Sequence, residues 1–213
     1  MKYKCLAISI ILVLMQMIPV NASTGVQIIP ISSTNKENMP YIIDKDTGKV
    51  LYYDLNDFQI NTHTTYNNND TQGLSYSGTI AVPYSSKSLS YDGTDETYSV
   101  RVAITLYYNR EMISYLYAYQ PVKADVTYTI LDSSVHQGMA SITIYGHTAE
   151  VEKQNTEYFS TLSSSVSADT SYPYVTADDH PGICGAESTV ILQHGVGTEW
   201  EFVFPAFLVN NRY

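Results

Sequence analysis

The chain has 213 residues, with 21 acidic and 11 basic side chains and a formal net charge of −10. This acidic balance, without a basic cluster, argues against nucleic-acid binding and against attraction to anionic membranes. Twenty tyrosines beside few charged residues favour half-buried strands over helices.

The first 22 residues have the layout of a secretory signal peptide. Lys2 and Lys4 precede a mostly apolar run, residues 6–18, and we expect cleavage between Ala22 and Ser23. The run is shorter than the roughly 20 residues that cross a bilayer as a helix. The sequence therefore predicts a secreted, extracellular protein with no membrane span after leader removal. The mature chain would have 191 residues and a net charge of −12.

The mature part begins with a polar stretch that has one short apolar patch, residues 26–31. Two β-prone runs, Tyr41–Ile43 and Val50–Tyr53, then flank the Asp/Gly turn 44–48, which predicts a hairpin. We expect residues 23–213 to form one domain, with the part up to about residue 69 as a candidate hairpin extension.

Strict alternation of apolar and polar residues dominates the middle of the chain. It covers residues 74–82, where Gly78 is a candidate bulge, and residues 98–108. Asn109–Glu111 is the expected turn, and Met112–Tyr119 the returning strand. Gln120 and Pro121 are expected to separate this strand from the next one.

The second half shows the same period at residues 122–130 and 140–144. Residues 149–155 are a candidate short helix, and the serine-rich stretch 160–167 is expected to be exposed. A Gly195/Gly197 turn between two β-prone runs predicts a hairpin, with Trp200 on its apolar face. The fold prediction is all-β with little helix: an antiparallel β-sandwich, or alternatively an open β-barrel.

Two stretches give the chain a resemblance to known proteins. They are Val126–Val135, with the sequence VTYTILDSSV, and Glu199–Phe204, with the sequence EWEFVF. In its pattern of β-prone strands, the region from Tyr98 to the last residue resembles uncharacterised secreted β-rich proteins of Gram-positive bacteria. The resemblance implies a β fold and export, and it implies no activity.

Cys184 is the one cysteine left once Cys5 is removed with the leader, so the mature chain cannot form an internal disulfide. His180 lies four positions before Cys184, a spacing that allows a thiol nucleophile with a base, or two metal ligands. A buried cysteine acting as a small apolar residue is the favoured alternative. A disulfide between two chains is left open.

Acidic turns suggest two other kinds of site. Asp46-Thr47-Gly48 matches the tripeptide of aspartic proteases, but the sequence has no second copy, and a hairpin turn explains it. Asp44 with Asp46, and the loop Asp92, Asp95 and Glu96, are candidate calcium ligands, although neither has the full spacing of a calcium loop. Solvated turns are the favoured alternative, so we expect no cofactor, with calcium as the alternative.

Tyrosines provide the candidate ligand-binding residues. Tyr115 and Tyr117 alternate along the expected strand 112–119. Tyr107 lies on the polar face of the preceding expected strand, residues 98–108. Exposed aromatic rings could stack on sugars, whereas cross-strand packing in the core is the alternative.

The functional prediction is a secreted, non-enzymatic β-module that binds a glycan or a protein at the cell surface. Two alternatives stand beside it. One is a secreted hydrolase with dispersed carboxylates, because the separation of such groups depends on the fold. The other is a secreted toxin or pore-forming subunit, whose alternating strands would line an oligomeric barrel.

Overall fold

The computed structural model describes residues 38–64, 71–83 and 99–212, and the regular secondary structure in these ranges is almost entirely strand. The leader with its cleavage site, the apolar patch 26–31 and the acidic loop 92–96 lie outside the described residues. The elements, in chain order, are β1 (Tyr41–Asp44), β2 (Val50–Tyr52), the short 3₁₀ helix η2 (Leu55–Asp57), β3 (Gln59–Thr64), β4 (Gln72–Ile80), β5 (Val100–Ile113), β6 (Leu116–Ile130), β7 (Val135–His147), β8 (Glu152–Phe159), β9 (Ser163–Ser167), β10 (Val175–Thr176), β11 (Gly182–His194) and β12 (Glu199–Asn211).

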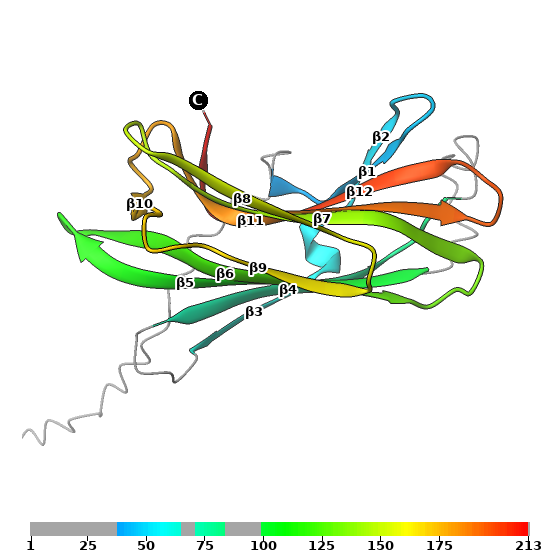
Figure 1. Ribbon diagram of the computed structural model, residues 1–213, viewed down its shortest axis with the longest axis horizontal. Helices are drawn as coiled ribbons and strands as arrows, with labels where there is room; N and C mark the ends of the chain where they lie inside the picture. The colour runs from blue at the N-terminus through cyan, green and yellow to red at the C-terminus, as the bar shows by residue number, and fades with distance from the viewer. Residues whose placement is uncertain (1–37, 65–70, 84–98, 213) are drawn as a thin grey trace, which may run out of the picture.

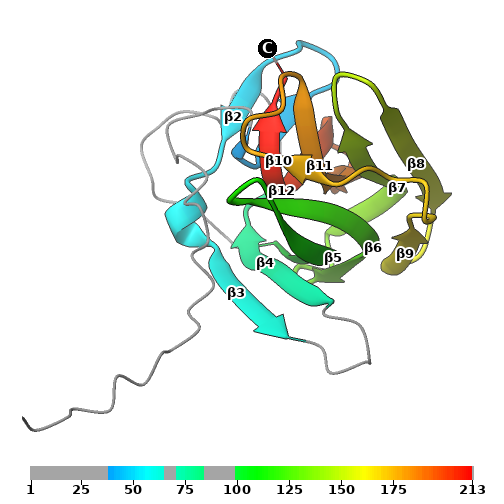
Figure 2. The ribbon, with the colours of Figure 1, turned by 90° about the vertical axis from the view of Figure 1, so that its left-hand side faces the viewer.

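Two antiparallel sheets lie face to face (Figures 1 and 2). Sheet A has the strand order β2-β1-β12-β11-β7-β8, and sheet B has the order β10-β6-β5-β4-β3, with β9 also paired to β6. The prediction of an all-β antiparallel sandwich is confirmed: the strands form two layers and not a closed barrel.

The period-two pattern of the sequence places one face of each long strand in the core. In β5, Val102, Ile104 and Leu106 are fully buried, and in β12 the same is true of Trp200 and Phe202. These side chains belong to one buried cluster that includes residues of both sheets. Burial of this apolar surface, at about 25 cal/mol per Å², is the main force that holds the layers together.

One polar contact crosses the core. Tyr128 of β6 in sheet B lies 2.6 Å, hydroxyl to hydroxyl, from Ser188 of β11 in sheet A. Ser188 Oγ in turn donates to the carbonyl of Ser141 on β7, at 2.8 Å. Because both hydroxyl-bearing side chains are buried, the hydrogen bonds satisfy groups that have no access to water.

The position of the β5–β6 turn differs from the prediction. Asn109–Glu111 lie inside β5, and the turn consists of Ser114 and Tyr115, which both have positive φ (49° and 71°). Two positive-φ residues between paired strands make a type I′ turn, whose twist suits a hairpin. The polar residues at 109–111 were misleading because this part of β5 extends past the core.

Strand β6 also continues where a break was expected. Gln120 and Pro121 belong to it, and the register with β5 shifts between Tyr107 and Tyr108, which leaves Val122 as the extra residue of a bulge. A bulge is one of the few places where a strand tolerates proline. Gly78, by contrast, interrupts no register: its missing side chain makes room for the Phe58 ring, whose Cε1 would lie 2.6 Å from an added Cβ.

The predicted helix at 149–155 is wrong, because Glu152–Phe159 form edge strand β8, paired with β7. The serine-rich stretch 160–167 is largely exposed, as predicted, although five of its eight residues form strand β9 and Val166 is buried against the core. In both cases pairing with a long neighbour decides the conformation over local propensity.

Candidate functional site

The end of the β5–β6 hairpin, residues Arg110–Tyr117, is the most exposed apolar surface formed by consecutive described residues. In Figure 1 it projects at the left of the molecule, beyond the neighbouring strands. The exposed fractions are 63% for Met112, 40% for Ile113, 96% for Tyr115 and 42% for Tyr117. We call this segment the hairpin end.

Strand register explains why these side chains are exposed. Met112 pairs with Tyr117, and both lie on the face of the hairpin that, nearer the middle of the strand, bears the buried Tyr108. The hairpin extends beyond the edge of the opposite sheet, so the last residues on this face are not covered by that sheet. Arg110 lies on the same face, with its guanidinium carbon 4.7 Å from the centre of the Tyr117 ring, which is a cation–π contact.

The three tyrosines predicted to bind a ligand do not form one flat surface. Tyr115 is in the turn and Tyr117 beside it, whereas Tyr107 is on the opposite face of the β5–β6 ladder. Tyr107 is half-buried, with the Lys123 ammonium 5.5 Å from its ring centre. Tyr119, the next aromatic residue on the face that bears Tyr117, is buried, with its ring centre 5.7 Å from that of Tyr108.

Met112, Ile113 and Arg110 were not among the sequence-based candidates. They were missed because the turn was expected at residues 109–111, whereas it lies at Ser114 and Tyr115. The sequence signal that could have located it is the apolar pair Ile113 and Leu116 on either side of Ser114-Tyr115. This dipeptide lacks the glycine that usually marks a two-residue hairpin loop.

The residues proposed for thiol or metal chemistry are not brought together. Cys184 is fully buried between the sheets, and this burial raises the pKa of its thiol, whereas His180 is exposed in the preceding loop. A buried thiol with a raised pKa is a poor nucleophile. Within the described ranges, no three His, Cys, Asp or Glu side chains are grouped so that they could hold a metal ion. Calcium binding stays a prediction.

The Asp46-Thr47-Gly48 motif forms the β1–β2 turn, with Gly48 at φ 69°. Its centre is Asp44, whose Oδ1 accepts hydrogen bonds from the backbone N–H groups of Asp46 and Thr47 at 2.9 and 3.1 Å. Burial opposes ionisation of Asp44, but the hydrogen bonds from Thr47 and Asp46 outweigh it, so the pKa of this carboxyl lies below its ordinary value. Asp46 itself is exposed. The motif therefore has a structural explanation as a turn.

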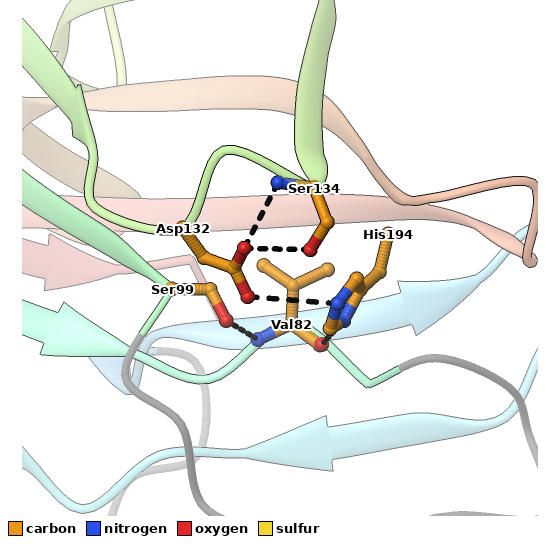
Figure 3. A network of polar contacts seen from close by, with 5 residues as sticks. All are labelled: Val82, Ser99, Asp132, Ser134 and His194. Carbon is orange, nitrogen blue, oxygen red and sulfur yellow. Dashed lines mark hydrogen bonds and ion pairs between the residues drawn. The ribbon is translucent and has the colours of Figure 1, made fainter.

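A network of polar side chains joins three turns at one end of the sandwich (Figure 3). Asp132 Oδ1 accepts hydrogen bonds from the N–H and the hydroxyl of Ser134, at 2.9 and 2.6 Å. Its Oδ2 lies 3.6 Å from His194 Nε2, while His194 Nδ1 lies 3.0 Å from the carbonyl oxygen of Val82. Ser99 Oγ accepts from the N–H of Val82 at 3.4 Å.

Serine, histidine and aspartate occur together here, but their order is not that of a nucleophilic triad. A triad needs the serine hydroxyl on the imidazole, whereas Ser134 directs its hydroxyl to the Asp132 carboxylate. The hydrogen bonds from Ser134, helped by His194, hold the pKa of Asp132 below its ordinary value. The arrangement ties the β6–β7 and β11–β12 turns to the residues after β4, which is a structural role.

Asp132→Asn is expected to lower the melting temperature at pH 7, because the charged acceptor of the network is lost. The folded-state pKa is lowered, so the stabilisation is present above the ordinary value of 3.8 and disappears as the pH falls through the folded value. Melting curves from pH 7 down to about pH 2 should therefore converge for the two proteins. Asp46→Asn, in an exposed turn, is the control, and a gap for Asp132→Asn that is constant over this range would contradict the prediction.

Comparison with known proteins gives no assignment: no family model, curated protein or solved structure matches the chain. The resemblance to exported β proteins of Gram-positive bacteria stays a prediction. The described part of the chain contains no helix with the length and apolar character needed to cross a bilayer.

Proposed function

We propose that the protein is a secreted, non-enzymatic binding module that contacts a protein partner through the hairpin end. The observation that supports this best is the run of exposed large side chains, Met112, Ile113, Tyr115 and Tyr117, on one projecting hairpin. Met112 and Tyr117 share one face of this hairpin, Tyr115 lies in the turn beside them, and Ile113 is on the opposite face. Exposed apolar side chains gathered in this way on a folded protein are typical of interaction sites.

The composition of the hairpin end favours a protein partner over a glycan. Tyrosine, methionine and arginine are enriched in protein–protein interfaces, and tyrosine and arginine supply most of the residues with large energetic effects. A sugar-binding platform would instead need several rings in one plane, and Tyr107 is on the other face of the ladder from Tyr117. The two-residue turn also fixes the backbone of the hairpin end before binding, which reduces the entropy lost on association.

Export is the second part of the proposal, and it depends on the leader sequence. Lys2, Lys4 and the apolar run 6–18, followed by Ala22, supply the three regions of a signal peptide. An acidic mature chain would approach anionic cell-wall polymers against electrostatic repulsion, so a protein contact is the better means of attachment. The hydrolase and the pore-forming subunit stay predictions from the sequence, because no contact among the described residues favours either.

Binding of the mature chain, residues 23–213, to intact cells tests this function. The double variant Tyr115→Ala/Tyr117→Ala should lose at least about tenfold in affinity, the loss expected when interface tyrosines are truncated. Tyr158→Ala is the matched control, because Tyr158 is 73% exposed on β8, away from the hairpin end.

Two treatments separate the classes of partner. Mild proteolysis of the cell surface should abolish binding, and a glycan array should give no signal above background. Unchanged affinity of the double variant would overturn the role of the hairpin end. Binding that survives proteolysis and reappears on the array would show a glycan partner instead.

A further inference from the structure

A second surface, distant from the hairpin end in the chain, combines aromatic rings with one carboxylate. It lies on the outer face of sheet A, the face turned away from sheet B. Glu187 of β11 is at its centre, between Ala186 and Ser188, which both point into the core. Around it are Tyr41 of β1, Tyr145 of β7 and Phe207 of β12. We call these four residues the Glu187 surface.

Register places the four residues together. Gly185, two positions before Glu187 on the same face of β11, pairs with Tyr145 on one side and with Phe207 on the other. The ring centres of Tyr145 and Phe207 are 5.9 Å apart. Tyr41 pairs with Val203 of β12, and Val203 pairs with Thr189, two positions after Glu187 on the same face of β11. Burial, and after it the charge of Glu187, raise the pKa of both Tyr41 and Tyr145.

The Glu187 carboxylate has no hydrogen bond or ion pair with any residue of the described ranges, although the residue is largely buried. Burial is the main reason why its pKa is raised; Arg212 acts in the opposite direction and Glu201 adds to the increase. A largely buried carboxylate without a hydrogen-bonded partner is costly for a folded protein. A positively charged group placed against it would remove that cost.

The chain itself shows which cation suits this face. Arg212 has its guanidinium carbon 5.3 Å from the centre of the Phe207 ring, and its Nε donates to Asn210 Oδ1 at 2.9 Å. The guanidinium is thus stacked at the border of the Glu187 surface without forming an ion pair with Glu187. Planar guanidinium groups stack on aromatic rings and donate to carboxylates at the same time, which an ammonium group does less well.

We propose that the Glu187 surface binds an arginine side chain of a partner protein, and that Arg212 competes with it from within the chain. Phe207 is buried in the free protein, with the Arg212 guanidinium against its ring. The partner's guanidinium would displace Arg212 from this ring, lie over Tyr145 and Phe207, and donate hydrogen bonds to Glu187. This site is separate from the hairpin end, so it stands whether or not the hairpin end binds a partner.

The test uses N-acetyl-arginine methylamide as the probe and the neutral citrulline analogue as its isosteric control, in NMR titrations of the mature chain. The arginine probe should bind with a dissociation constant on the order of 1 mM, and the citrulline analogue at least tenfold more weakly. Glu187→Gln should weaken binding of the arginine probe at least tenfold. Glu157→Gln, on the exposed edge strand β8, is the matched control and should bind as the wild type does.

Arg212→Ala should tighten binding of the probe severalfold, because the internal competitor is gone. Equal binding of the two probes, or wild-type affinity in Glu187→Gln, would overturn the site. Unchanged or weaker binding in Arg212→Ala would overturn the competition.

A melting curve shows that Glu187→Gln is folded and gives a second readout. The folded-state pKa of Glu187 is raised, so its charge destabilises the protein above the ordinary value of 4.5. Glu187→Gln should therefore melt a few degrees higher than the wild type at pH 7, with no gain below about pH 4. A lower melting temperature at pH 7 would mean that Glu187 already has a stabilising partner, and the proposal would fail.

Discussion

Gly185→Ala is expected to lower the free energy of unfolding by about 3 kcal/mol, which corresponds to a fall of roughly 10 °C in melting temperature for a chain of this size. An added Cβ would lie 2.7 Å from the Cα of Phe207 and 2.8 Å from the carbonyl oxygen of Ala206. Both are backbone atoms of β12, so the contact can be relieved only by moving the strand. Urea denaturation measures the change.

Gly138→Ala provides the control for this experiment. Its added Cβ would lie 3.2 Å from the Ile191 side chain, at an exposed position of β7 where a small side-chain movement is possible. We expect a cost below about 1 kcal/mol there. Equal costs at the two glycines would show that β12 can move away from β11. If Gly185→Ala remains folded, displacement of Phe207 should also weaken binding of the arginine probe to the Glu187 surface.

Ser188→Ala is expected to cost about 2 kcal/mol, because it leaves the Tyr128 hydroxyl buried without a partner. Tyr128→Phe should cost less, about 1 kcal/mol, since Ser188 keeps its bond to the Ser141 carbonyl. The double variant removes both hydroxyls and should cost about 2 kcal/mol, less than the two single changes together. Strict additivity in urea denaturation would contradict the view that this contact couples the sheets.

The strands and the core are the parts that the sequence predicts well. Alternation at Val102, Ile104 and Leu106, and again at Trp200 and Phe202, marks the buried faces, because a strand with one dry face must repeat every two residues. The β1–β2 hairpin follows equally directly from the Asp/Gly turn. Each of these features depends on neighbours in the chain.

Features that depend on distant residues were predicted poorly. Residues 152–159 form a strand because β7 offers a free edge, and no local signal reports that edge. The turn at Ser114-Tyr115 was misplaced because Asn109–Glu111 are polar for a different reason, namely that the hairpin extends past the sandwich. Polarity in the sequence indicates exposure, and exposure does not always mean a turn.

The Glu187 surface could not be found from the sequence. Its residues come from strands β1, β7, β11 and β12, and only their order in sheet A places them side by side. Glu187 occupies a polar position in an alternating strand, which is indistinguishable from an ordinary solvated one in the sequence. That its carboxylate is largely buried without a hydrogen-bond or ion-pair partner among the described residues follows only from the folded arrangement of sheet A.

The order of strands in sheet A has a consequence for how the chain acquires its structure. β12, the last strand of the described chain, lies between β1, the first, and β11. Until residues 199–211 are available, β1 and β2 cannot join the rest of sheet A, and the Trp200 side of the core is missing. Contacts between such distant segments form slowly. A nascent chain would therefore stay incompletely folded until residues 199–211 have been synthesised. Under the export proposed above, such a chain could still be threaded through a narrow translocation pore.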